Sequence, residues 1–277
     1  MMKFTFLSEN KTERDNCMAE FGLSIFIETE EMKILFDAGA SDLFIKNAAS
    51  RSVNLEEAEA LIISHGHYDH TEGVPAFCRI NSQAPVYLHK NAFGASYGMT
   101  RGVIDENSCG ILWDEKTKQE ILPRIRFTDG PLWLTDQIVI SGTIPDMEGM
   151  RPTETFWRKN EQGELIQDDM SREQFLAVHC GDQGIYLFSG CSHKGVIPAL
   201  EYAKHLFPDE KITGLVAGMH LFGADGQMRQ KVVERIVSEK LDMVMPVHCT
   251  GIEAICMLKN ALGNRCIVAT AGDTYRF

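Results

Sequence analysis

The segment at residues 61–70, "LIISHGHYDH", constrains this chain more than any other, because an apolar run ends there in three histidines and an aspartate. A short apolar run bounded by turn residues predicts a buried β-strand. His65, His67 and Asp69 follow a period of two, so in an extended segment they project to one side, while His70 points elsewhere as the chain turns toward a helix. One strand end can therefore present two diverging pairs of ligands.

These side chains have the chemistry of metal ligands. Neutral imidazole and carboxylate groups suit Zn²⁺, Fe and Mn²⁺, and two such ions about 3.5–4 Å apart can share a bridging hydroxide. A surface turn that merely happens to be rich in histidine is the alternative, and the apolar strand leading into the turn argues against it. The segment therefore predicts a dinuclear metal site.

The composition is that of a globular protein with excess negative charge. The 277 residues are 44% hydrophobic and 24% charged, and 39 acidic against 27 basic residues give a formal net charge of -12. Because such a field repels nucleic acid and anionic membranes, we expect neither as a partner. We expect a small-molecule substrate, which a metal or a basic group would hold if it is anionic or phosphorylated. Nothing in the sequence indicates the oligomeric state.

The cysteines and the amino terminus bear on the compartment. The amino terminus lacks the apolar core of a signal peptide, and no apolar run approaches the roughly 20 residues that span a bilayer, so we expect a cytoplasmic protein. The eight cysteines form no CxxC pair, and in that compartment most should be reduced and buried. Cys180, Cys191 and Cys249 differ from the others because they lie beside ligand-type residues.

Strand and helix patterns alternate along most of the chain, which predicts an α/β or a layered α+β fold. No linker or low-complexity segment divides it, so we expect a single domain over residues 1–277. Residues 91–170 are polar and punctuated by glycine and proline. We expect this insertion to be rich in loops and hairpins and to form walls of the active site.

Three stretches in the second half repeat the pattern of a histidine between an apolar strand and a glycine-containing turn. They read "FSGCSHKG", "VAGMHLFG" and "MPVHCTG". They contribute the candidate ligands Cys191, His193, His220 and His248.

The segment "LIISHGHYDHTEG", preceded by "ILFDAGA", resembles the metallo-β-lactamase fold, whose signature HxHxDH follows a buried strand. The resemblance implies a four-layer αββα sandwich, classed as α/β or in some schemes as α+β. It also implies that His65 and His67 hold a first metal and that Asp69 and His70 hold a second. Asp37, in the preceding strand turn, would support the ligands rather than bind a metal.

The stretches "ENKT" and "DDMSREQFL", with the three histidine stretches above, look like one subgroup of that superfamily. The subgroup is named for dihydropterin ribofuranosylaminobenzene-phosphate synthase, and the resemblance covers nearly the whole chain. Cys191 stands where many members have a bridging aspartate, and His193 and His248 match later ligands. His220 is a ligand, a substrate contact or a neighbour of the site.

One departure concerns the first metal. Most hydrolases of this fold carry a Gly-His motif midway along the chain, and the matching region, "VISGTIPDMEG", has no histidine. The first site must therefore draw on His193, His220 or Glu148, or stay incomplete.

The leading hypothesis is a dinuclear metal-dependent hydrolase in which metal-bound hydroxide attacks a phosphoester, ester or lactone. Asp69 would orient the hydroxide or relay its proton. The two ions would be Zn²⁺, with Mn²⁺ or Fe²⁺ as alternatives. The candidate residues for contacting a phosphate are Lys194, Arg101, Arg151 and Arg158. The alternative for each is a solvated surface charge without such a role.

Two other functions stay open. One is a transferase of the dihydropterin ribofuranosylaminobenzene-phosphate synthase type. The other is a metal-binding or sensor protein without turnover, although an open site of histidine and carboxylate ligands favours catalysis.

Overall fold

Two main β-sheets, each with its own helices, organise this protein in a computed structural model that describes residues 1–100, 102–152, 155–160 and 162–277. The chain forms two compact units. Unit 1 is made of Met1–Asp129, Trp157–Ile166 and Thr270–Phe277, and unit 2 of Gly130–Phe156 and Gln167–Ala269. The expected α/β class is confirmed because each unit combines a sheet with helices. The single domain over residues 1–277 stays a prediction.

Unit 1 is built on a seven-stranded sheet in the order β18-β1-β2-β3-β4-β5-β9. Its strands are β1 (Lys3–Ser8), β2 (Ser24–Glu28), β3 (Lys33–Phe36), β4 (Ala60–Ile62), β5 (Val86–His89), β9 (Ile125–Thr128) and β18 (Thr274–Arg276). β1, β2 and β3 pair antiparallel, whereas β3, β4, β5 and β9 are parallel. Parallel strands end at the same edge of a sheet, so the turns after β3 and β4 lie side by side.

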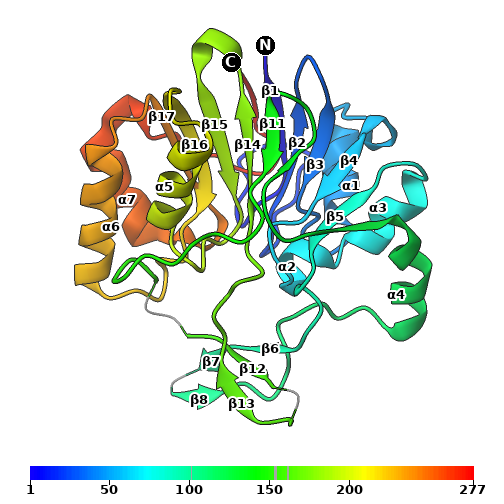
Figure 1. Ribbon diagram of the computed structural model, residues 1–277. Helices are drawn as coiled ribbons and strands as arrows, with labels where there is room; N and C mark the ends of the chain where they lie inside the picture. Colours follow the sequence, from blue (N-terminus) through cyan, green and yellow to red (C-terminus); the bar gives the residue numbers. More distant parts are fainter. Residues whose placement is uncertain (101, 153–154, 161) are drawn as a thin grey trace. The chain divides into compact units, whose positions relative to one another are not determined.

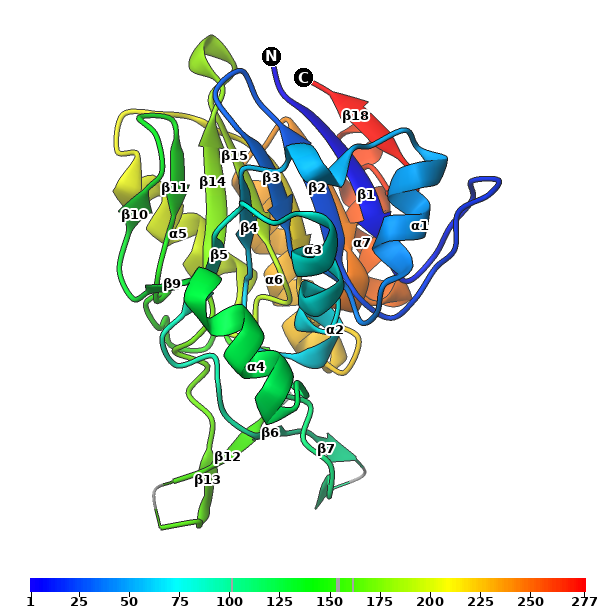
Figure 2. The ribbon, with the colours of Figure 1, turned by 90° about the vertical axis from the view of Figure 1, so that its right-hand side faces the viewer.

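Helices α1 (Leu43–Ser50) and α3 (Val74–Ile80) lie on one side of this sheet (Figure 2). Phe44 of α1 and Phe77 of α3 are fully buried in the core that also holds Leu61 and Val86 of the sheet. Between them in the chain is the one-turn helix α2 (Tyr68–Thr71), which follows the predicted strand and carries Asp69 and His70. The remaining helical segments of the unit are η1 (Leu55–Glu57), α4 (Glu115–Ile121) and η2 (Leu122–Arg124).

Short strands dominate the ends of the 91–170 segment (Figure 1). They are β6 (Ser96–Tyr97), β7 (Met99–Thr100), β8 (Val103–Ile104), β12 (Trp157–Lys159) and β13 (Leu165–Gln167). β7 pairs antiparallel with β8, and β6 joins β12 and β13 in a small sheet. The middle of the segment, however, supplies β9 to one main sheet and β10 and β11 to the other. The role of this segment in forming walls of the active site stays a prediction.

Unit 2 is built on a six-stranded sheet in the order β10-β11-β14-β15-β16-β17. Its strands are β10 (Leu132–Trp133), β11 (Ile138–Ile140), β14 (Phe175–His179), β15 (Ile185–Ser189), β16 (Ile212–Gly218) and β17 (Met243–Val247). The pairs up to β14 and β15 are antiparallel, and β15, β16 and β17 are parallel. The carboxyl ends of the last three strands therefore lie at one edge.

Helices α5 (Val196–Leu206), α6 (Gly226–Ser238) and α7 (Ile252–Leu262) cover this second sheet (Figure 1). Shorter 3₁₀ segments are η3 (Gly181–Gln183), η4 (His248–Thr250) and η5 (Gly263–Arg265). The predicted alternation is present here as β15, α5, β16, α6, β17 and α7, whereas residues 267–273 after α7 form no strand. Among the described residues, no helix has the length and the apolar character needed to cross a bilayer.

Candidate metal centre

His65, His67, Asp69 and His70 form a compact group in the turn after β4, here called the first ligand cluster. All four side chains are at most 5% exposed. The His65 ring centroid lies 4.6 Å from that of His67 and 4.3 Å from that of His70. His70 Nε2 is 3.8 Å from Asp69 Oδ2. The turn therefore gathers three imidazoles and one carboxylate away from bulk water.

Asp37, in the neighbouring turn after β3, holds this cluster in place. Its fully buried carboxylate accepts hydrogen bonds from His70 Nδ1 at 2.6 Å and from both the backbone N–H and the hydroxyl of Ser64 at 2.7 Å. Because His70 donates through Nδ1, its Nε2 is the nitrogen left to bind a metal. The position of Asp37 therefore fits the supporting role that the resemblance implies.

The backbone of the first ligand cluster is held closely. Asp69 O accepts from Leu23 N at 3.2 Å, and His70 O accepts from Ala38 N at 2.9 Å. Gly66 has no room for a side chain, because a Cβ there would lie 2.3 Å from Ala92 O. These contacts leave the turn little freedom to rearrange.

Unit 2 gathers a second ligand cluster at the ends of β15, β16 and β17. It consists of Cys191, His193, His220, His248 and Cys249, each at most 6% exposed. The ligand atoms of Cys191, His220 and Cys249 all lie within 4.8 Å of one another. The His193 and His220 ring centroids are 4.4 Å apart, and the Phe156 ring packs against both imidazoles.

Strained backbone marks the second cluster. Ser192, His220 and His248 have φ values of 55°, 47° and 48°, in the left-handed region that non-glycine residues seldom adopt. Such residues cost of order 1–3 kcal/mol each and persist where the surroundings hold them. Thr250 holds two of the strand ends, since its hydroxyl accepts from Met219 N at 3.2 Å and donates to Val247 O at 2.7 Å.

Glu173 holds the turn that follows β15, the remaining strand end of the second cluster. Its fully buried carboxylate accepts from His193 N at 2.7 Å and Lys194 N at 2.8 Å. Burial raises the pKa of Glu173 to about 7, although both hydrogen bonds oppose that rise. Glu173 has no signal in the sequence other than its place in the "DDMSREQFL" stretch, and it was not predicted.

Cys249 is a second member of this cluster that was not predicted to be a ligand. Burial by itself would raise the pKa of its thiol, but hydrogen bonds with Cys191 and His220 and the nearby His248 lower that pKa well below the usual value. The thiolate is the form that binds metals. Cys180, also noted from the sequence, lies in the turn before β15, at the opposite end of that strand from Cys191.

The candidate phosphate contacts in unit 2 are already paired with acidic groups. Lys194 Nζ lies 2.9 Å from Asp146 Oδ2, and Arg151 bonds to Asp146 Oδ1 at 3.1 Å and to the Asp169 carbonyl. Arg158 lies in β12 of unit 1, and Arg101 lies outside the described residues. Glu148, one alternative for completing the first site, is exposed.

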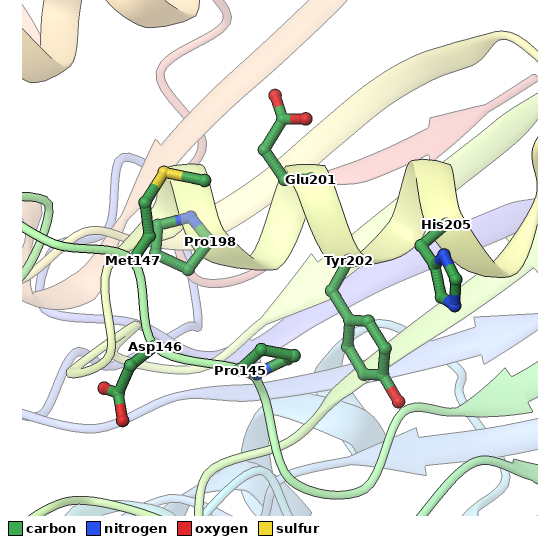
Figure 3. A pocket seen from close by; sticks show the side chains of 7 residues that line it. All are labelled: Pro145, Asp146, Met147, Pro198, Glu201, Tyr202 and His205. Atoms are coloured by element: carbon green, nitrogen blue, oxygen red, sulfur yellow. The ribbon is translucent and has the colours of Figure 1, made fainter.

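Two of the pockets that the described residues form lie within unit 2. One, of about 120 Å³, adjoins the second cluster. It is lined by Arg151, Pro152, Thr155, Phe156, Gln167, Asp168, Met170 and His193. The other, of about 210 Å³, lies between residues 145–147 and α5, with Tyr202 projecting from the helix toward Pro145 (Figure 3). Only the smaller pocket includes a member of the second cluster.

Comparisons with known proteins agree on one superfamily. A family model described as the metallo-beta-lactamase superfamily matches residues 18–144. An uncharacterized protein of Methanocaldococcus jannaschii is 31% identical over 245 residues, covering 87% of this chain and 88% of its own length. The 7,8-dihydropterin-6-methyl-4-(beta-D-ribofuranosyl)-aminobenzene-5'-phosphate synthase of the same organism is 26% identical over 255 residues, or 85% and 83% of the two chains.

A solved structure is similar over the full length. It is the crystal structure of a metal-dependent hydrolase of the beta-lactamase superfamily, with a TM-score of 0.85 and 26% identity, covering 100% of this chain and 99% of that one. Ribonuclease J 1 of Streptococcus pyogenes also matches, at 31% identity over 114 residues, which is 38% of this chain and 19% of that enzyme. The expectation that nucleic acid is excluded is therefore not supported.

Proposed function

This chain belongs to the metallo-beta-lactamase superfamily, as the HxHxDH resemblance indicated, and on that premise we propose that it is a dinuclear metal-dependent hydrolase. The observation that carries the proposal is the buried first ligand cluster, in which Asp37 engages His70 Nδ1 and leaves Nε2 for a metal. The full-length similarity to a metal-dependent hydrolase supports the same reaction class.

The proposed ligands are those expected from the sequence. They are His65, His67, Asp69 and His70 of unit 1 and Cys191, His193 and His248 of unit 2, with His220 as a further ligand or substrate contact. The donor chemistry fits divalent transition ions: imidazole and carboxylate suit zinc, manganese or iron, and the thiol of Cys191 favours zinc among these. Zinc and the cytoplasmic location stay predictions.

Bound divalent ions would supply an activated water and a Lewis acid. Asp69 has a carboxylate oxygen close to His70 Nε2 and is suited to orient that water and take up its proton at Oδ. Asp37 keeps His70 in one tautomer, and Glu173 fixes the backbone that carries His193. The pocket beside His193 offers space for part of a phosphoester, ester or lactone.

A synthase-type transferase is the second candidate, because the similarity to the dihydropterin ribofuranosylaminobenzene-phosphate synthase extends over most of both chains. The same ligands would serve it, since a Lewis acid assists group transfer as well as hydrolysis. A metal-binding protein without turnover is the third reading.

One screen separates these functions. Purified protein is tested against bis-p-nitrophenyl phosphate, p-nitrophenyl acetate, a lactone, and a dihydropterin together with a ribofuranosylaminobenzene phosphate. We expect hydrolysis that falls at least about 100-fold in His67→Ala, because loss of a ligand should exceed the 10–100-fold effect of losing a ligand's partner. His205→Ala is the matched control, since that histidine is exposed on α5.

Other results would reject the hydrolase. Turnover only with the two pterin-pathway compounds would favour the transferase. Tight metal binding with no turnover of any probe would favour the non-catalytic reading. Equal activity in His67→Ala and wild type would show that the first ligand cluster does not act in the reaction measured.

A further inference from the structure

Cys191, His220 and Cys249 come from three different strand ends of unit 2 but converge on one small volume. Their ligand atoms lie within 4.8 Å of one another, and Cys249 Sγ is 3.5 Å from the Cys191 carbonyl oxygen. Cys249 and Cys191 are both 2% exposed and His220 is 6% exposed. From this arrangement we infer that the three residues form a thiolate site, within unit 2, for one soft divalent ion such as Zn²⁺, Co²⁺ or Cd²⁺.

The separations suit a single ion. Ligands of a tetrahedral ion at 2.0–2.3 Å are roughly 3.3–3.8 Å apart, so the separations between atoms that lie within 4.8 Å of one another need to shorten by about 1.5 Å at most. Two thiolates and one imidazole select soft ions over Mg²⁺ and Ca²⁺. Three protein ligands leave a fourth position open, as in zinc sites that exchange a water for a substrate.

The surroundings keep the donors together without a metal. A Cβ on Gly218 would lie 2.9 Å from Cys249 Sγ and 2.3 Å from Gly190 O, so only glycine lets this thiol approach the β15 end. Thr250 Oγ1 accepts from Met219 N and so ties the residue before His220 to the turn that carries Cys249. The His220 ring is flanked by Phe156 and Phe222 at centroid distances of 5.6 Å and 5.2 Å.

The inference goes beyond the proposed function, because it adds Cys249 to the ligands and needs no residue of unit 1. It does not depend on hydrolysis. If the protein turns over no substrate, the thiolate site can still be detected by its absorption spectrum. If the three residues bind no ion, the first ligand cluster can still bind ions through its nitrogen and oxygen atoms.

The test is a Co²⁺ titration of the full-length protein after chelator treatment and under a reducing agent. Thiolate ligation of Co²⁺ is read from the sulfur-to-metal charge-transfer absorption. We expect this band in wild type, about half of it in Cys249→Ser, and the full band in Cys266→Ser, which removes a buried thiol outside the site. His67→Ala should keep the band, because the first ligand cluster is not needed for it.

A band of wild-type intensity in Cys249→Ser, or its loss in His67→Ala, would overturn the inference. If Cys249→Ser does not fold, X-ray absorption of wild-type protein with one equivalent of Cd²⁺ decides instead. Two sulfur neighbours per ion are expected there, and one or none would refute the site.

Discussion

The two ligand clusters are both buried, yet they are held by different means. Asp37 in unit 1 bonds to the side chain of a ligand, His70, whereas Glu173 in unit 2 bonds to the backbone that carries His193. The first cluster spans six consecutive residues and none of its four ligands has a positive φ in the described chain, whereas the second draws on three strand ends and has strained His220 and His248. The ligands of the first cluster all come from one turn, whereas those of the second meet only when three strands are in place.

The largest effect expected from this comparison concerns the two glycines that let the backbone close around each cluster. A Cβ at Gly66 would lie 2.3 Å from Ala92 O, and one at Gly218 would lie 2.3 Å from Gly190 O. Because backbone cannot yield as a flexible side chain does, Gly66→Ala and Gly218→Ala should each lower the free energy of unfolding by about 3 kcal/mol. Denaturant unfolding measures this, and Gly130→Ala, with open space around it, is the control. A loss below about 1 kcal/mol in either variant would mean that its cluster is not tightly packed.

Asp37→Asn should mainly weaken metal binding. The new amide would place an N–H₂ group near the donors His70 and Ser64, so His70 would lose its fixed tautomer. Metal affinity should fall about 10–100-fold, measured by competition with a chromophoric chelator. Unchanged affinity would show that Asp37 has no part in holding the ligands.

Glu173→Gln should mainly lower stability. The amide can accept from only one of His193 N and Lys194 N, which leaves a buried donor unpaired at a cost of about 1–2 kcal/mol. Denaturant unfolding of metal-free protein measures the change. If Glu173→Gln lost as much metal affinity as Asp37→Asn while keeping wild-type stability, the proposed difference between the roles of Asp37 and Glu173 would be wrong.

The smallest effect lies outside both clusters, on β18 of unit 1. Burial and the charge of Asp273 raise the pKa of Tyr275 to about 12. The folded protein therefore keeps a proton that the unfolded chain loses, so this contribution is complete below about pH 10 and is lost as the pH rises toward 12. Tyr275 is only half-buried, so the loss should be about 1 kcal/mol. Tyr275→Phe should show a correspondingly shallower decline in denaturant midpoint between pH 9 and 11.5, and parallel curves would contradict this assignment.

The first ligand cluster could be predicted from sequence because a strand end and six residues contain all of it. The apolar run correctly predicts the strand β4. The extended segment expected from the period of two in "HGHYD" is wrong, because residues 64–66 bend and Asp69 lies in the one-turn helix α2. Asp37 was expected from the resemblance to the superfamily, which places an aspartate in the strand turn before the histidine motif. Parallel pairing of β3 and β4 then brings its carboxylate beside Ser64 and His70.

The second cluster could be predicted only in part. Its histidines were recognisable because each follows an apolar strand, and Cys191 came from the resemblance to the superfamily. The closeness of Cys249 to Cys191 depends on the parallel order of β15, β16 and β17. Sequence does not show that order. The left-handed conformation of His220 and His248 has no signal either, because neither is a glycine. The division into two units also had no linker to mark it.

We propose that the first and second ligand clusters bind transition-metal ions. The most direct test is elemental analysis of wild-type protein purified without chelator, alongside His67→Ala. We expect at least two transition ions per chain in wild type and fewer in the variant. Finding no ion in wild-type protein that has never met a chelator would contradict it.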